Sequence, residues 1–147
     1  FVKFKFSSSI FALDYDTYSS LFKFTFINLF HKTYCMYKQI KPDMIYHYFD
    51  QDIELIHEII ELVLELNVQD LKNLMPLYEE GQISIIKKKF HKSKPVFSLL
   101  GANNLNKSIS ALEYDINDQF LEKYPFLLKN LNELEEDLNS FLKRSHH

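Results

Sequence analysis

A regular seam of apolar residues near the C-terminus limits most strongly how this chain can fold. Its members are separated alternately by four and three positions: Phe120, Tyr124, Leu127, Leu131, Leu134, Leu138 and Phe141. Residues at this spacing share one face of an α-helix, which has about 3.6 residues per turn. The seam therefore predicts a long helix with one buried side, in which Pro125 lies near the first turn or marks a bend.

A second long helix is expected to begin at Asp50 or Asp52 and to end at Gly81. Its apolar positions recur at three and four, apart from one wider step near Asn67: Ile56, Ile59 or Ile60, Val63, Leu66, Leu71, Leu74 and Tyr78. We expect Pro76 to bend or divide this helix, because its ring displaces the hydrogen bond to the carbonyl four residues earlier.

Two shorter amphipathic segments lie between these helices. Residues 83–100 predict a helix that ends at Gly101 and has as its core positions Ile86, Phe90, Ser93, Phe97 and Leu100. Asn103 is expected to cap the next helix, whose seam is Leu105, Ile109, Leu112 and Ile116. An additional short helix is expected over residues 42–49, where Pro42 suits the first turn.

The composition favours an all-α fold. The 147 residues include two glycines and four prolines, which are too few for the many turns of a β-rich fold. Four amphipathic helices with short links can bury their apolar stripes together only by packing side by side. We therefore expect one domain, an antiparallel up-down-up-down four-helix bundle with the extra short N-terminal helix laid across one end.

The texture of the chain changes near Met36. Residues 1–35 contain eight of the 14 phenylalanines and few acidic residues. Three interpretations of this segment stay open: an extra packing element, a membrane-proximal or targeting remnant, or residues outside the natural domain. Residues 36–144 form the expected bundle, and residues 145–147 are interpreted as the remnant of an expression tag.

Charge and motif content argue against several classes of function. The net charge of −3 gives no reason to expect nucleic-acid binding, and no apolar run reaches the roughly 18 residues of a membrane span. The single cysteine, Cys35, fits a reducing compartment, so a cytoplasmic location is expected. His31 and Cys35 are four residues apart, but two ligands do not make a zinc site, and no metal is expected. The chain also lacks a glycine-rich loop for ATP phosphates.

His91 is the most informative candidate for chemistry. With Phe90 facing the core, His91 lies about 100° further round the helix, at the edge of the buried stripe or outside it. Five lysines gather around it: Lys87, Lys88, Lys89, Lys92 and Lys94. A neutral imidazole can accept a phosphoryl group, and a nearby ammonium can neutralise the charge that arrives. This positive cluster in an otherwise acidic chain suits a phosphoryl dianion and an acidic docking partner.

His91, Lys94 and the pair Gly101-Ala102 together resemble the motif of the histidine-containing phosphotransfer (Hpt) family of multistep two-component signalling. The resemblance covers residues 36–144, and it implies that His91 accepts the phosphoryl group while Lys94 stabilises it. The binding residues expected around them are Lys87, Lys88, Pro95 and Ser98. Pro95 is a departure, because glycine is commoner at that position of the family and proline loosens or bends the helix.

A second departure concerns the helix after His91. Family members often place a polar amide near the histidine from that helix, and Glu113 and Asn117 are the two candidates in this chain. We assign neither, because an acid beside a phosphoryl group is unfavourable.

The resemblance implies a phosphoryl carrier without autokinase activity. A response-regulator receiver domain or a hybrid sensor histidine kinase would supply the group from a phospho-aspartate, and a second receiver would take it. Mg²⁺ is expected on the partner, and no cofactor on this chain. The docking surface would be an apolar rim with Val96 and the 50–80 helix. Two alternatives stay open: a helical docking or adaptor module that binds receivers or kinases without phosphate, and an unrelated scaffold whose lysine face meets acidic protein or lipid.

Overall fold

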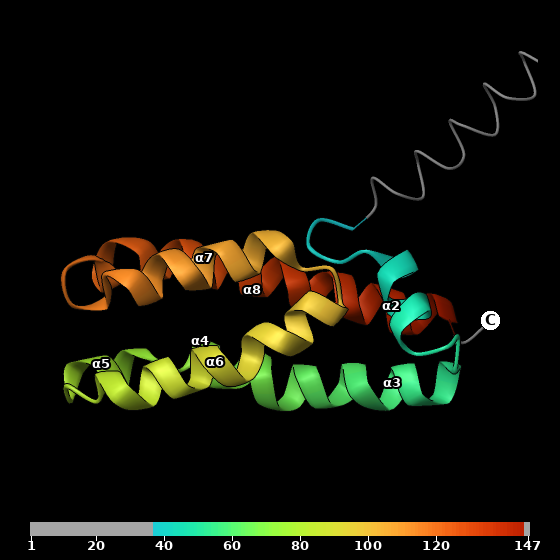
Figure 1. The fold of residues 1–147 in the computed structure, drawn as a ribbon, viewed down its shortest axis with the longest axis horizontal. Helices are drawn as coiled ribbons and strands as arrows, with labels where there is room; N and C mark the ends of the chain where they lie inside the picture. Colours follow the sequence, from blue (N-terminus) through green and yellow to red (C-terminus); the bar gives the residue numbers. More distant parts are fainter. Residues whose placement is uncertain (1–36, 146–147) are drawn as a thin grey trace, which may run out of the picture. The chain divides into compact units, whose positions relative to one another are not determined.

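The computed structural model describes residues 37–145, and every regular element within that range is helical (Figure 1). In chain order the elements are α2 (Pro42–Tyr48), α3 (Ile53–Leu62), the π-helix η1 (Val63–Val68), α4 (Gln69–Lys72), α5 (Met75–Glu79), α6 (Ile83–Leu99), α7 (Asn103–Tyr114) and α8 (Ile116–Ser145). The all-α prediction is therefore confirmed for this range. The Phe-rich segment 1–35, with His31 and Cys35, lies outside the described residues, as do residues 146–147.

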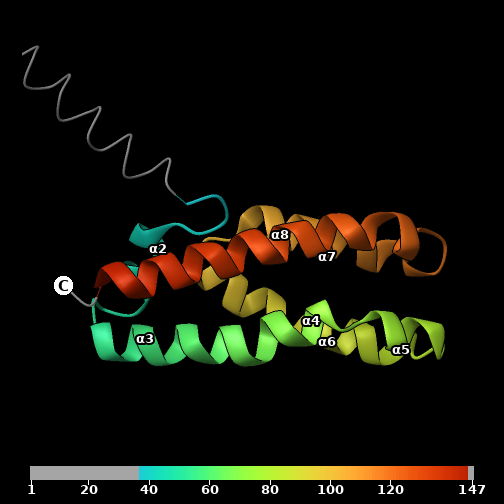
Figure 2. The same cartoon turned by 180° about the vertical axis from the view of Figure 1, so that it is seen from behind.

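α8 supplies the largest share of the core. All seven members of its predicted seam are buried, which confirms the long C-terminal helix. α7 packs against both α6 and α8, and α3, η1 and α4 each contact α8 as well. Figure 2 shows α8 running along the molecule from the start of α3 to the region of α5. None of the helices in this part of the chain is long and apolar enough to cross a lipid bilayer.

One of the two expectations for Pro125, a place near the first turn of its helix, was wrong. α8 begins at Ile116, directly after a short break at Asp115, and continues across the proline. A proline inside a helix leaves the carbonyl four residues earlier, that of Leu121, without its helical donor. The Leu121 side chain is 61% exposed, so this part of the helix faces solvent and water can serve the carbonyl.

The second long helix begins and divides where the sequence indicates. Asp52 is its N-cap, and the Asp52 carboxylate accepts a hydrogen bond from a backbone N–H in the first turn. The helix ends at Lys72, and Pro76 lies in the first turn of α5. The hydroxyl of Tyr124 bridges the gap: it donates to the carbonyl of Lys72 at 2.6 Å and accepts from the N–H of Leu74 at 3.2 Å.

One core position of this helix was predicted wrongly. Leu66 was placed on the buried seam, but its side chain is 47% exposed, and Val68 is buried instead. The reason is η1, a stretch of π-helix in which each turn holds more residues than in an α-helix. The buried positions Val63 and Val68 are therefore five apart, which explains the wider step near Asn67 in the sequence.

Gly101 makes the turn between α6 and α7 possible. Its φ of +73° belongs to the left-handed region, which favours glycine. A Cβ atom added there would lie 2.7 Å from Cβ of Lys41, whose own N–H donates to the carbonyl of Leu100 at 2.9 Å. The end of α6 is thus held directly against the residue that precedes α2.

The cap of α7 differs from the prediction. Ala102 occupies the N-cap position, and Asn103 is the first helical residue, with no side-chain cap. The helix starts one residue early because the Ala102 carbonyl accepts the N–H of Asn106 at 3.1 Å.

Candidate functional site

α6 brings His91 to the surface of the molecule. The neighbouring core positions Ile86, Phe90, Ser93 and Phe97 are buried, so the residue after Phe90 is turned outward, as the spacing predicts. The His91 side chain is 72% exposed. The imidazole is therefore open to a group presented by another molecule.

Glu113 of α7 links the two residues that the resemblance assigns to phosphoryl chemistry. His91 Nε2 lies 2.8 Å from Oε1 of Glu113, and the Lys94 ammonium donates to Oε2 of the same carboxylate. The Glu113 side chain is only 17% exposed and that of Lys94 26%. One carboxylate thus fixes both an imidazole and an ammonium, which places the imidazole and the Lys94 side chain next to each other.

This bridge determines which imidazole nitrogen can react. A carboxylate accepts a hydrogen bond, so the neutral ring carries its proton on Nε2 beside Glu113 and its lone pair on Nδ1. The negative charge of Glu113 would repel a phosphoryl group, and Lys94 opposes that repulsion. Glu113 was not assigned from the sequence because of its charge, and the structure places it in contact with His91.

Pro95 lies inside α6, which continues to Leu99. Next to it, the Lys94 carbonyl accepts a hydrogen bond from the Ser98 hydroxyl and another from Nδ2 of Asn106, both at 3.1 Å. Asn106 Nδ2 also lies 2.8 Å from the Ser98 hydroxyl oxygen. Ser98 thus contacts the backbone of α6 and the amide of α7. Asn106 was not predicted from the sequence. It donates to the Lys94 carbonyl and not to the His91 carbonyl, which is the one that Pro95 leaves without its helical donor, so the proline gives no signal for it.

The lysines of α6 fall into two groups. Lys89 forms an ion pair with Asp70 at 2.7 Å, and Lys94 pairs with Glu113. The other three have exposed side chains: Lys87, Lys88 and Lys92. The predicted binding residue Pro95 is exposed as well. The surface around His91 therefore presents positive charge to solvent.

The long helix approaches α6 at a different edge from α7. Asn67 donates to the Ser93 hydroxyl at 3.1 Å, on the side of α6 that also carries Lys89. Leu62 and Leu66, which precede Asn67 on the same helix, are both about half exposed, at 53% and 47%. Val96, expected on the docking rim, is partly buried against the core. His91 itself is bonded to Glu113 of α7.

Comparison of the chain with protein-family models, curated proteins and solved structures found no match.

Proposed function

We propose that this protein carries a phosphoryl group on His91 between receiver-domain aspartates, as an Hpt domain does. The observation that carries the proposal is the exposed His91 imidazole held beside the Lys94 ammonium by the shared carboxylate of Glu113. An accessible nucleophile next to a fixed cation is the combination that phosphoryl transfer requires.

The proposal includes the bundle topology. α3 to α5, α6, α7 and α8 would be the four arms of an antiparallel up-down-up-down bundle, with α2 as the short extra helix. The support comes from the links: a few residues connect α6 to α7, and Asp115 alone separates α7 from α8. Links this short join antiparallel neighbours. Such a bundle would hold His91 and Glu113 on two adjacent, rigid helices.

The transfer step follows from the tautomer. The lone pair of His91 Nδ1 attacks the phosphorus of a receiver's phospho-aspartate in line with the bond to the aspartyl oxygen. The N–P bond forms as the P–O bond breaks, and the electron pair leaves on the aspartate carboxylate. Nε2 keeps its proton, and the Glu113 carboxylate balances the positive charge that the ring acquires. In this proposal the Lys94 ammonium donates to the phosphoryl oxygens.

The partners proposed are response-regulator receiver domains or a hybrid sensor histidine kinase, in the cytoplasm. Each brings the phospho-aspartate and its own Mg²⁺. The exposed lysines of α6 suit the acidic surface around such an aspartate. The half-exposed leucines Leu62 and Leu66 offer apolar area for docking.

The test is direct phosphorylation. The protein is incubated with phosphorylated receiver domains and, separately, with phosphoramidate, a small donor that phosphorylates imidazoles. The expected product is acid-labile and alkali-stable phosphate on the natural protein, and none on His91→Gln. The matched control is His47→Gln, because His47 is an exposed helical histidine of α2. Label that persists in His91→Gln, or disappears in His47→Gln, would contradict the assignment.

Lys94 has a matched control on the same helix. With phosphoramidate as the donor, Lys94→Ala should slow phosphorylation while the bundle stays folded. Lys88→Ala, which removes an exposed lysine outside the Glu113 bridge, should change that rate little, because no receiver docks in this assay. Binding of receivers without any label would favour the second candidate, an adaptor module that docks receivers or kinases. The exposed Lys87, Lys88 and Lys92 are the observation behind that alternative.

A further inference from the structure

A second polar site lies between α7 and α8, on a different face of α7 from the His91 site. It is a pocket of about 410 Å³, a size within the range of small-molecule sites. Asn106 and Glu113 of α7 contact α6, whereas Ser108 of α7 accepts a hydrogen bond from Asn130 of α8 at 2.8 Å. Ser108 and Asn130 line the pocket, so it is independent of the phosphotransfer chemistry.

One of the residues that line this pocket has a buried acceptor without a hydrogen-bond partner within residues 37–145. Gln39 is 7% exposed, and its Nε2 donates to Glu133 Oε2 at 2.8 Å and lies 3.5 Å from Asn130 Oδ1. Reversing the amide would set its oxygen against both of these oxygens, so the orientation is fixed. Gln39 Oε1 therefore lies on the side of the amide away from Glu133, and it has no hydrogen-bond partner among the described residues. A buried acceptor in this state favours a ligand that brings an N–H donor.

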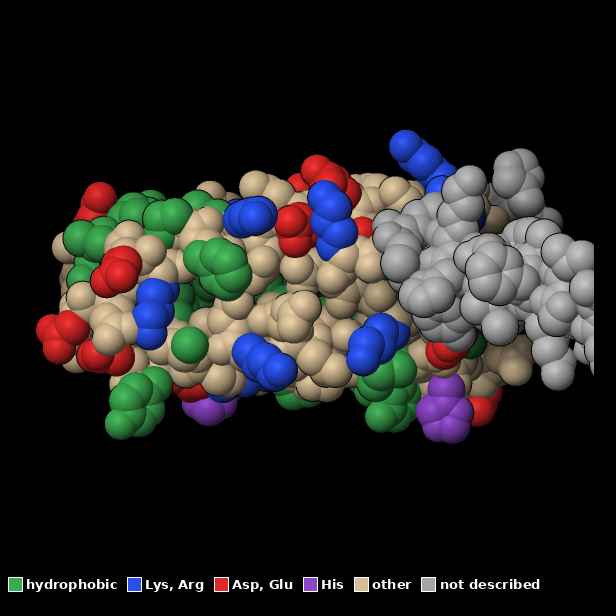
Figure 3. All heavy atoms as spheres, turned by 90° about the horizontal axis from the view of Figure 1, so that it is seen from above, with side chains coloured by type: hydrophobic (Ala, Val, Ile, Leu, Met, Phe, Trp, Pro, Cys, Tyr) green, Lys and Arg blue, Asp and Glu red, His purple; other side chains and the backbone are tan. Residues whose placement is uncertain are grey.

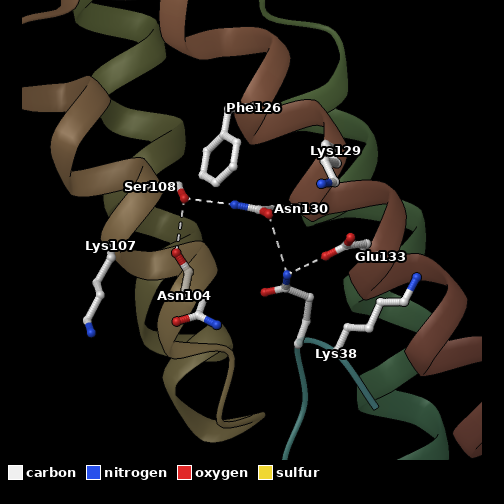
Figure 4. Close-up of a pocket in the computed structure, with 9 residues that line it drawn as sticks. Lys38, Asn104, Lys107, Ser108, Phe126, Lys129, Asn130 and Glu133 are labelled. Atoms are coloured by element: carbon white, nitrogen blue, oxygen red, sulfur yellow. Dashed lines mark hydrogen bonds between the residues drawn. The ribbon is translucent and has the colours of Figure 1, made fainter. Parts of the chain in front are cut away.

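The charge of the pocket selects an anion. Lys107 stands on the α7 side and Lys129 on the α8 side, and Lys38 lies by Glu133 (Figure 4). Lys38 pairs with Glu136 at 3.7 Å, but neither Lys107 nor Lys129 has an ion pair within residues 37–145. Lysine and arginine side chains are spaced out singly over the face shown in Figure 3.

The start of α7 adds to the positive potential. Its first turn lines the pocket through Asn104, and the helix has no side-chain cap. The N–H groups of Asn103 and Asn106 donate to the carbonyls of Gly101 and Ala102, so only the remaining N–H groups of the first turn are open to a ligand. A phosphate group suits this combination of ammonium groups and a helix N-terminus.

An aromatic surface completes the site. Phe126 of α8 is 58% exposed, and its ring points toward Ser108 and Asn130 in Figure 4. An exposed phenyl face beside a polar pocket offers a stacking platform for a flat ring.

We propose that this pocket binds a purine nucleotide. The phosphate lies between Lys107 and Lys129 at the start of α7, the ring stacks on Phe126, and an exocyclic amino group donates to Gln39 Oε1. Binding of this kind uses side chains and a helix end, so it needs no glycine-rich loop.

The test is a titration of the full chain with adenosine 5′-monophosphate, followed by calorimetry and by NMR of the Gln39 side-chain amide. Two probes separate the contacts: adenosine lacks the phosphate, and purine riboside 5′-monophosphate lacks the amino group. Each should bind at least about fivefold more weakly than adenosine 5′-monophosphate. Phe126→Ala should weaken binding by at least about fivefold as well, because a stacked base is lost.

The variants that decide the case alter exposed side chains and leave Gln39 in place. Lys129→Ala should weaken nucleotide binding about fivefold, whereas Lys143→Ala, at the far end of α8, should not change it. His91→Gln should bind the nucleotide normally, so failure of the phosphotransfer proposal leaves this one standing. No binding at millimolar nucleotide, equal binding of inorganic phosphate, or binding unchanged in both Phe126→Ala and Lys129→Ala would overturn the inference.

Discussion

Two glycines with nearly the same backbone conformation allow the contact between α6 and the segment before α2 to be measured. Gly81 and Gly101 have φ values of +71° and +73°. An alanine at either position adopts the left-handed region at a cost of about 1–2 kcal/mol. At Gly81 the added Cβ meets nothing within 4 Å, but at Gly101 it would lie 2.7 Å from Cβ and 3.0 Å from Cγ of Lys41.

Gly81→Ala should therefore lower the free energy of unfolding by about 1 kcal/mol, from backbone strain alone. Gly101→Ala carries the same strain and must also push Lys41 away, which adds about 1–3 kcal/mol, as overpacking does elsewhere. Urea unfolding followed by circular dichroism measures both variants. The melting temperature should fall in the same order, by about 2–4 °C per kcal/mol. Equal losses for the two variants would refute the close approach of Lys41 to the end of α6.

Three other predictions concern the site, the helix break and η1. Glu113→Gln should slow phosphorylation of His91 about fivefold, because glutamine keeps an acceptor for the imidazole. Glu113→Leu, which removes the acceptor, should slow it more than tenfold. Quench-flow measurements with phosphoramidate would contradict this if the two variants reacted equally fast. Burial raises the pKa of Tyr124 above 10.0, against a smaller lowering by the Leu74 N–H. The unfolded chain therefore loses this proton first, and stability should fall as the pH rises from about 10 through the folded pKa, less steeply in Tyr124→Phe than in the natural protein. Val68→Ala should lower the free energy of unfolding by about 2 kcal/mol, and Leu66→Ala should lower it by under about 0.5 kcal/mol. The opposite order in urea unfolding would mean that η1 is absent.

The buried face of a helix could be predicted from the sequence wherever its apolar residues recur at a regular spacing. The seam of α8 keeps the same alternation of four and three throughout, and all its members are buried. Asp52 and Pro76 are local signals, since a cap and a helical proline act on their own backbone. Such features do not depend on what packs against them.

Features that depend on contacts with a second helix could not be predicted from the sequence. The exposure of Leu66 follows from η1, and Asn67 within that turn bonds to Ser93 of α6, a partner that periodicity does not reveal. Glu113 was left unassigned on charge alone, because its position between His91 and Lys94 depends on how α7 meets α6. The roles of His91 and Lys94 stay predictions that the phosphorylation experiments decide.

The π turn between Val63 and Val68 stores one additional residue without breaking the helical path. Inserting a residue into an ordinary α-helix would rotate everything after it by about 100° and carry Leu71 and Leu74 out of the core. The wide turn absorbs that rotation locally. A homologous chain with an unbroken α-helix here should therefore align with this one only through a one-residue gap at this turn, and a comparison without gaps would misplace every downstream position.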